Sequence, residues 1–386
     1  MTESDVRSAL RGINGVQKVE LSAFSDIYTL TFGSGAKLDE KTIQDVFKGC
    51  AYNGRKVVIE QDRQAIADFI GTRPLPASPD ENPTTPGKVA LGKRLFFDAR
   101  LSAHGKMSCA TCHRPEYGFA NPDKIAPKGF DGTQIPRNVP TIINAGYSRS
   151  LFLDGRAKTL EEQALGPIQH PAEMGSKPDE LVHRLADVPE YSNAFQQEFN
   201  GPMTVERIAQ AIAAYERTLV SNNTPFDQYV HGDLAAMSQS AKRGYVVFRD
   251  KANCITCHSG PDFTDGALRR IGTGWNGEKY TDLGRGKISK RAGDNGKFRV
   301  PTLRELVWTG PYMHDGSFKT LKEVVDYYDR GGTKDAPTDL HGPLKLTDQE
   351  KNDLVAFLES LSFSWEQPFR TALQSAESES IASTKE

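Results

Sequence analysis

Hydrophobic and polar positions alternate in the first part of the chain and follow a helical period in most of the rest. Residues 16–22 and 27–32 alternate apolar and polar side chains, and 56–59 do so over a shorter run, which predicts three strands. Two short amphipathic stretches, 5–10 and 41–47, predict helices. The predicted order in this region is therefore helix, strand, strand, helix, strand.

This order over residues 1–62 resembles a heavy-metal-associated, ferredoxin-like module that lacks its first strand. The metal-binding Cys-x-x-Cys loop of that family is absent, because Cys50 stands alone. We expect a small α+β module with a docking or structural role, followed by a linker at 63–87 that is rich in Pro and Thr toward its end. Cys50 is expected to be a small buried apolar side chain.

Residues 88–362 are predicted to be mostly helical and to form two halves. Helices are predicted at 89–97 and 241–248, each shortly before a pair of cysteines. Thr347 and Glu350 predict a capping box at the start of the last helix. One earlier apolar stripe falls on a single helical face, as core packing requires: Ile208, Ala211, Ile212, Tyr215 and Leu219.

Composition excludes some classes of partner. The 386 residues carry a net charge of −2 with 25% charged side chains, so no nucleic acid partner is expected. No apolar run approaches 18 residues, so no transmembrane segment is expected. The first ten residues lack the pattern of a signal peptide, which we expect to have been removed. The tail, 363–386, is rich in Ser and Glu toward its end and is predicted to be disordered.

Four of the five cysteines form two C-x-x-C-H motifs, Cys109–Cys112 with His113 and Cys254–Cys257 with His258. This is the attachment motif of c-type haem, in which both thiols bond to the porphyrin and the histidine binds the iron. A zinc ribbon would place its two pairs about 15–20 residues apart, whereas these lie 145 positions apart. A thioredoxin-like pair or a disulfide would leave both histidines unexplained. We therefore predict two covalently bound haem c groups.

Four further strings accompany these motifs: LGKRLFFD at 91–98, DGRAKTLEEQ at 154–163, DLGR at 282–285 and PYMHDG at 311–316. Together they resemble the bacterial di-haem cytochrome c peroxidase family, including its MauG branch, over roughly residues 80–362. The resemblance implies a mainly α fold with two cytochrome c-like haem domains after the small α+β module. The first, 88–225, would be the peroxidatic domain and the second, 226–362, the electron-transfer domain.

The resemblance also implies how peroxide meets the first haem, whose proximal ligand would be His113. In the peroxidase branch, a histidine from the following loop blocks the distal face at rest. Residues 114–140 contain no histidine, so we expect an open first haem, as in the MauG branch. The family's distal acid–base pair corresponds to Glu173 and Gln163, because cleavage of the O–O bond needs a proton moved between its oxygens.

Local pattern is consistent with the role of Gln163. Thr159 and Glu162 predict a capping box, after which Gln163 falls on an apolar helical face with Leu160, Ala164 and Pro167. A glutamine in this position needs a partner or a ligand. Two histidines stay open as further candidates in this pocket: His170, three residues before Glu173, and the more remote His104.

At the second haem, His258 would be the proximal ligand and the opposite ligand decides the branch. Peroxidases place methionine 14 residues after the His of the His-Asp-Gly motif and MauG places tyrosine, and counting from His314 gives Tyr328. Helical geometry agrees, because Tyr328 shares a face with Leu321, Val324 and Val325 after a Thr320–Glu323 cap, and Tyr327 points about 100° away. Met313, in a turn, is the competing ligand. A tyrosine ligand would lower the reduction potential.

The resemblance further implies a calcium ion between the domains, held by the side chain of Asn138 and the backbone carbonyls of Thr309 and Pro311. Two positions depart from the family. Leu153, preceded by Phe152, stands where a tryptophan commonly couples the haems, although Phe152 or Tyr147 could lie on the route. Ala252 stands where MauG has a tryptophan that passes oxidising equivalents to its protein substrate.

Three functions follow from these patterns. The favoured hypothesis is a MauG-like enzyme in which hydrogen peroxide produces high-valent iron that oxidises a partner protein. The alternative is a cytochrome c peroxidase that reduces peroxide to water with electrons from a small redox protein. A plain electron-transfer cytochrome is the third, and it would need two closed haems. Because haem is attached outside the cytoplasm, the mature protein is expected in the periplasm.

Overall fold

The computed structural model describes residues 16–21, 28–32 and 75–363. The chain forms two compact units, Met1–Asp68 and Phe69–Glu386. In the first, β1 (Val16–Leu21) pairs with β2 (Tyr28–Phe32) in antiparallel register, Val19 opposite Leu30. This confirms the two predicted strands. The predicted helices and third strand of the ferredoxin-like module lie outside the described residues, as do Cys50 and the tail from residue 364, so that module is not confirmed.

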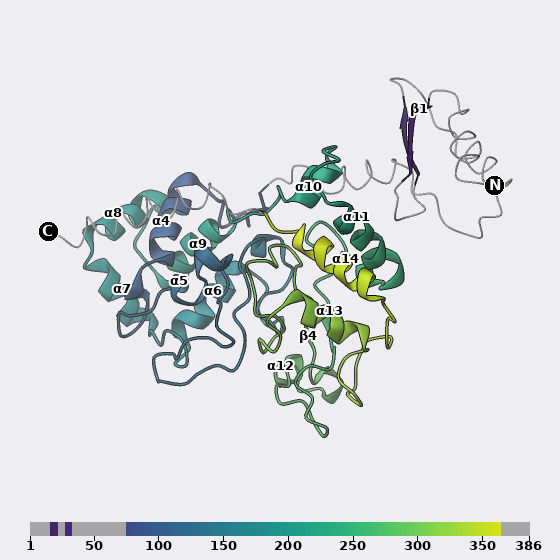
Figure 1. Ribbon diagram of the computed structural model, residues 1–386. Helices are drawn as coiled ribbons and strands as arrows, with labels where there is room; N and C mark the ends of the chain where they lie inside the picture. Colours follow the sequence, from purple (N-terminus) through teal and green to yellow (C-terminus); the bar gives the residue numbers. More distant parts are fainter. Residues whose placement is uncertain (1–15, 22–27, 33–74, 364–386) are drawn as a thin grey trace, which may run out of the picture. The chain divides into compact units, whose positions relative to one another are not determined.

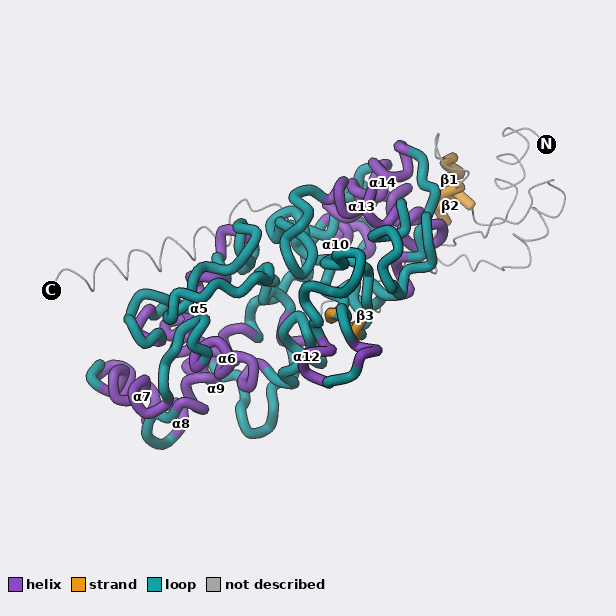
Figure 2. The backbone as a smooth tube through the Cα atoms, turned by 90° about the horizontal axis from the view of Figure 1, so that it is seen from below, coloured by secondary structure: helices purple, strands orange, loops and turns teal. Residues whose placement is uncertain are grey.

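The second unit is mainly helical, which confirms the predicted fold class. Its strands are the short antiparallel pair β3 (Leu268–Arg269) and β4 (Phe298–Arg299). Figures 1 and 2 both show its helices in two neighbouring groups, α4 to α9 and α10 to α14. The α-helices are α4 (Pro86–Phe96), α5 (Cys109–Cys112), α6 (Leu160–Gln169), α7 (Pro178–Ala186), α8 (Pro189–Phe199), α9 (Val205–Glu216), α10 (Pro225–Val230), α11 (Gln239–Val246), α12 (Arg285–Ser289), α13 (Leu321–Asp329) and α14 (Asp348–Glu359).

In the first group, α4 packs across α9. A Cβ atom added at Gly92 of α4 would lie 1.8 Å from the carbonyl oxygen of Ala211 in α9, so the two backbones touch at this crossing. The predicted stripe of α9 is buried, with Ile208, Ala211 and Ile212 each 0% exposed. Leu219 belongs to the same core but lies beyond the end of the helix.

The second group repeats this crossing with α11 and α14. A Cβ atom added at Gly244 would lie 1.8 Å from the carbonyl oxygen of Asp353, the same separation as in the first group. The predicted capping box of Thr347 and Glu350 is present at the start of α14. Each crossing therefore fixes the helix that precedes a C-x-x-C-H motif against the last helix of its own half.

No helix in the described part of the chain is both long and apolar enough to cross a lipid bilayer.

Candidate active site

The first C-x-x-C-H motif forms the one-turn helix α5, which begins after Ser108 with a capping box to Thr111. The ring of His113 follows it, and its Nδ1–H donates a hydrogen bond to the backbone oxygen of Phe119 at 3.1 Å. Because a carbonyl oxygen can only accept, this bond fixes the proton on Nδ1 and leaves the Nε2 lone pair free for a metal. Burial lowers the pKa of His113, which favours the neutral form that binds iron.

The second motif is built in the same way. Nδ1–H of His258 donates to the backbone oxygen of Phe263 at 2.8 Å, and burial lowers the pKa of its imidazole. Both accepting phenylalanines have left-handed backbone, with φ of 55° at Phe119 and 51° at Phe263. Two separate segments thus adopt one device for orienting a ligand histidine.

None of the four motif cysteines is joined to another in a disulfide. Burial raises the pKa of Cys112 to about 11 and that of Cys254 to about 12. A thioredoxin-like pair would need a lowered pKa for its attacking thiol. No group of three or more His, Cys, Asp and Glu in the described part of the chain is placed to hold a metal ion. These observations favour the haem interpretation over the redox-pair and zinc alternatives.

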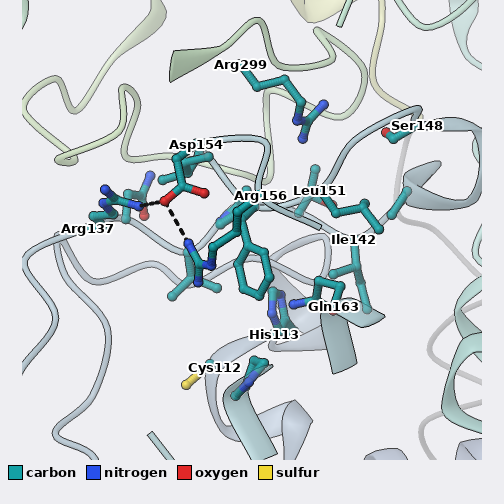
Figure 3. A pocket seen from close by; sticks show the side chains of 18 of the residues that line it. Cys112, His113, Arg137, Ile142, Ser148, Leu151, Asp154, Arg156, Gln163 and Arg299 are labelled. Atoms are coloured by element: carbon teal, nitrogen blue, oxygen red, sulfur yellow. Dashed lines mark hydrogen bonds and ion pairs between the residues drawn. The ribbon is translucent and has the colours of Figure 1, made fainter. Parts of the chain in front are cut away.

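A cavity of about 1180 Å³ opens beside the first motif and extends to the loop after His258. Its walls include His113, Gln163 from α6 and Glu173 from the turn that follows α6. Figure 3 shows His113 and Gln163 pointing into the same space. Thr159 caps α6 as predicted, because its side-chain oxygen accepts from the Glu162 backbone amide at 3.1 Å. The second bond of the predicted capping box differs, because the Glu162 carboxylate accepts from the backbone amide of Lys158 and not from that of Thr159.

Backbone hydrogen bonds hold Glu173 in place, and its carboxyl has no hydrogen bond to another side chain among the described residues. Its backbone amide donates to the backbone oxygen of His170 at 2.9 Å, and its backbone oxygen accepts from the Phe130 amide at 2.7 Å. Neither the Glu173 carboxyl nor the Gln163 amide hydrogen-bonds to another side chain in the described part of the chain. Burial raises the pKa of Glu173, against smaller opposing effects of His170 and Arg156. The two side chains predicted for acid–base chemistry therefore share one cavity.

The two open histidine candidates separate in the structure. His170 lines the cavity, and its Nδ1 accepts from the Ala172 amide at 3.2 Å. His104 is exposed, packs its ring edge-on against Phe130 at 5.6 Å and is not part of the cavity wall. Of the two candidates, His170 is therefore the one that lies in the cavity wall.

Arginines that were not singled out as site residues from the sequence line the cavity between the two halves. Arg137 donates to Asp154 at 2.8 Å and to Asp282 at 2.6 Å. Arg156 donates to Asp154 at 2.7 Å, as the dashed lines in Figure 3 show. The guanidinium of Arg156 also stacks 3.4 Å from the ring centre of Phe152. The carboxylate of Asp154 thus accepts hydrogen bonds from both Arg137 and Arg156.

Arg299 enters the cavity from the opposite wall, and its buried Nε has no hydrogen-bond partner in the described part of the chain. A buried guanidinium needs an anionic partner. The two carboxylates of a haem are such partners, so Arg299 together with Arg156 fits a haem seated on His113. The donors on this wall therefore fit the cofactor that the motifs predict.

Tyr328 and Tyr327 of α13 have different surroundings. The Tyr327 hydroxyl donates to the Ile271 backbone oxygen at 2.7 Å and its side chain is buried, so it is committed to packing. The Tyr328 hydroxyl has no hydrogen bond in the described part of the chain, and burial and then the nearby Cys254 raise its pKa. Only Tyr328 therefore has a free hydroxyl beside the second motif. The predicted capping box of Thr320 and Glu323 is present, and Met313 lies in the preceding turn.

The predicted calcium ligands come together in part. The Asn138 amide nitrogen contacts the backbone oxygen of Pro311 and lies 3.5 Å from that of Met313. Its Oδ1 is buried without a hydrogen-bond partner. An orphaned amide oxygen and backbone carbonyls are ligand types that suit a hard cation such as calcium, but here the amide nitrogen faces the carbonyls, so Oδ1 would join them only with the amide turned over. The side-chain hydrogen bonds of Asn138 reach Pro311 and Met313 and do not include Thr309.

An internal repeat links the two sites. The string DGRAKTLEEQ at 154–163 aligns with DGSFKTLKEV at 315–324. In both copies a residue with left-handed backbone lies shortly before the string, and the backbone then forms an antiparallel bridge across a turn. In both, a helix capped by the threonine follows. Continuing the alignment by four residues places Pro167 opposite Tyr328. Direct comparison of the two halves would have identified this pair from the sequence.

The residues expected near an electron route lie between the two halves. The Leu153 backbone oxygen accepts from the Arg299 amide at 2.7 Å, which joins the two halves directly. Phe152 and Tyr147 line the cavity with Leu153. Ala252 is 8% exposed and precedes the second motif. The position where the family commonly has a tryptophan is thus at the contact between the halves.

Comparison with known proteins agrees with this organisation. Residues 86–235 match the family model described as di-haem cytochrome c peroxidase, and residues 241–362 match the cytochrome c model. Methylamine utilization protein MauG of Methylorubrum extorquens is 42% identical over 308 residues, covering 78% of this chain and 86% of that protein. Cytochrome-c peroxidase IdrP1 of a Pseudomonas species is 40% identical, covering 75% and 84%.

Solved structures give the same relationship. A MauG-like protein associated with microbial copper homeostasis superposes with a TM-score of 0.69 at 32% identity, covering 76% of this chain and 94% of that chain. The diheme peroxidase BthA from Burkholderia thailandensis gives a TM-score of 0.65 at 26% identity, covering 75% and 90%.

Proposed function

Because the chain belongs to the family of di-haem cytochrome c peroxidases and MauG proteins, we propose that it uses hydrogen peroxide to oxidise a partner protein, as MauG-like enzymes do. The observation that carries this proposal is the contrast between the two motifs. The first faces a cavity with Glu173 and Gln163, and the second has the free hydroxyl of Tyr328 nearby. The first site would be open to peroxide and the second closed by a protein ligand.

Haem iron bound at the two motifs supplies the electron transfer to peroxide. The residues of the chain manage the proton and the orientation. Glu173 takes the proton from the peroxide oxygen nearer the ring and returns it to the departing oxygen. Burial raises the pKa of its carboxyl, which strengthens it as a proton acceptor. The Gln163 amide, free of other partners among the described side chains, donates a hydrogen bond that orients the peroxide.

Each turnover removes two electrons from the partner protein, and these reduce one hydrogen peroxide to two water molecules with the uptake of two protons. His113 and His258, with their rings fixed by backbone oxygens, would hold the two haem irons. Tyr328 would supply a further ligand at the second motif, where a phenolate would favour the oxidised iron. The protein acts in the periplasm, since haem attachment takes place outside the cytoplasm.

A calcium ion at Asn138 would hold the two halves in register. Its support is the buried Oδ1 of Asn138, which has no hydrogen-bond partner in the described part of the chain, on an amide whose nitrogen contacts the carbonyl of Pro311. Asn138→Ala should lower calcium affinity measured by calorimetry, with Asn121→Ala as a matched buried asparagine outside this cluster. Equal calcium affinity in both variants would contradict the site.

One observation favours the second candidate, a peroxidase that takes electrons from a small redox protein. Leu153 stands at the contact between the two halves, and a leucine has no accessible redox state to share an oxidising equivalent between haems. Several relatives are named cytochrome-c peroxidases. Under this alternative the electrons enter one at a time and no covalent change is left on the donor.

The test is stopped-flow mixing of the oxidised holoprotein with hydrogen peroxide, with no reductant present. The proposal predicts an immediate change in the haem absorption, which Glu173→Gln slows strongly. Mass spectrometry of a protein substrate then separates lasting oxidation from simple electron donation. A holoprotein that responds to peroxide only after one-electron reduction would contradict the open first site.

A further inference from the structure

Residues that line the cavity and are also exposed to solvent mark its opening. In the second half these include Leu283, Lys287 and Ile288, on and beside the short helix α12. In the first half they include Arg149. The rim thus combines positive charge with apolar side chains at the place where a partner would approach the first site.

The segment 279–291 carries more positive charge than its surroundings neutralise. Lys279, Lys287, Lys290 and Arg291 are exposed, and none forms an ion pair with a carboxylate among the described residues. The only acidic residue of the segment, Asp282, is already held by an arginine of the first half at 2.6 Å. Four exposed cations without a close ion pair among the described residues, in a stretch of thirteen, contrast with the net charge of −2 for the whole chain, although Glu278 lies next to the segment and Arg291 acts on Asp294.

Two large apolar side chains lie among these cations. Leu283 is 40% exposed and Ile288 is 41% exposed. Apolar contacts surrounded by charge are typical of protein docking surfaces, where the apolar centre supplies affinity and the charged rim steers the approach. Isolated lysines on a solvated surface would not need apolar neighbours at the mouth of a cavity.

We propose that residues 279–291 form the docking surface for an acidic partner protein at the cavity opening. This inference rests on the proposed function, since it names the charge of the protein that is oxidised and where it binds. Charge complementarity selects the occupant: a partner with a carboxylate-rich face gains attraction here, and a basic partner is repelled. The apolar pair, Leu283 and Ile288, then contacts the centre of that face.

The experiment compares the full-length holoprotein with the triple variant Lys279→Glu, Lys290→Glu, Arg291→Glu, whose three positions are exposed and do not line the cavity. A matched control, Lys319→Glu, Lys334→Glu, Lys345→Glu, changes the net charge equally at exposed positions outside residues 279–291. Two reduced probe proteins are oxidised with peroxide, the acidic copper protein plastocyanin and the basic mitochondrial cytochrome c. The small neutral phenol guaiacol reports the haem chemistry without docking.

For the acidic probe, the surface variant should raise KM at least ~10-fold at low salt, as steered association predicts, and the effect should shrink as salt rises. The control variant and all guaiacol rates should stay unchanged, and the basic probe should react poorly with the parent protein. Equal KM in both variants, or preference for the basic probe, would overturn the docking surface while guaiacol oxidation persists. Loss of peroxide-dependent guaiacol oxidation in the parent protein would instead refute the proposed function.

Discussion

The two haem pockets are built alike on one side and differently on the other. On the near side, each motif histidine donates to a left-handed, buried phenylalanine, Phe119 or Phe263. On the far side, the first pocket has a cavity with free carboxyl and amide groups, and the second has the hydroxyl of Tyr328. The attachment motif therefore determines where a haem is held, and the opposite wall determines what that haem can do.

The repeat identifies where the two halves diverge. Pro167 and Tyr328 occupy equivalent positions, four residues beyond the aligned strings. Proline has no side-chain atom that can bind iron, whereas a tyrosine hydroxyl can. Under the proposed function, this one difference between the halves is what would close the second site and leave the first open.

The largest expected effect comes from the carboxyl of the open pocket. Glu173→Gln should slow the reaction with peroxide by roughly 100- to 1000-fold, the range for loss of a general acid–base group. Burial raises the pKa of Glu173 above 4.5, and only the carboxylate form accepts the proton. The rate of the parent protein should therefore decrease as the pH is lowered through this raised pKa. Stopped-flow kinetics across pH measures both. Glu162→Gln, which changes an exposed carboxyl of α6, is the control and should keep the parental rate and pH profile.

Making the two halves alike is the second test. Pro167→Tyr should place a hydroxyl in the first pocket and slow the peroxide reaction about 10-fold, if the open form falls to roughly a tenth of the molecules. The high-spin absorption bands of the first haem should decrease in parallel. Pro167→Phe adds the ring without the hydroxyl, so equal effects of Phe and Tyr would show that bulk, not ligation, closes the pocket.

The closed pocket is tested by removing its hydroxyl ligand. Tyr328→Met should raise the reduction potential of the second haem on the order of 0.1 V, within the roughly 0.8 V that axial ligands span. Spectroelectrochemistry measures this value. Tyr327→Phe is the control: it should leave the potential unchanged and cost about 1 kcal/mol of unfolding free energy, because the bond to Ile271 is lost. A shift in potential on changing Tyr327 alone would reverse the assignment.

The two helix crossings should respond equally and have the smallest effect. Gly92→Ala and Gly244→Ala each place a Cβ atom 1.8 Å from a carbonyl oxygen. Each should reduce the free energy of unfolding by about 1–3 kcal/mol, as overpacking does. Thermal unfolding of the holoprotein checks this, and Gly293→Ala, where the added atom meets nothing, should be neutral. A loss at only one crossing would show that the two halves are not equivalent in packing.

Features that depend on a few neighbouring residues were predictable from the sequence. The haem motifs, the caps at Thr320 and Thr347, and the two first strands are of this kind, and the structure confirms the caps and the strands. The placement of Gln163 and Glu173 in one cavity was expected only through the family resemblance, because they lie ten positions apart, one in α6 and the other in the turn after it. Their catalytic roles stay predictions.

Features formed by distant residues were not predictable in the same way. The arginine network joins Arg137 to Asp282, which are 145 positions apart, and no local pattern connects them. The backbone contact at Gly92 depends on a helix more than a hundred residues later. The Pro167–Tyr328 pair is an exception, since comparing the halves reveals it without any structure.

The most direct test of an open first haem and a tyrosine-bound second haem is low-temperature electron paramagnetic resonance of the oxidised holoprotein, repeated on Tyr328→Met. The account predicts one high-spin and one low-spin ferric signal, with only the low-spin signal changed by the substitution. Two low-spin signals in the parent protein would contradict it, because the first haem would then be closed at rest.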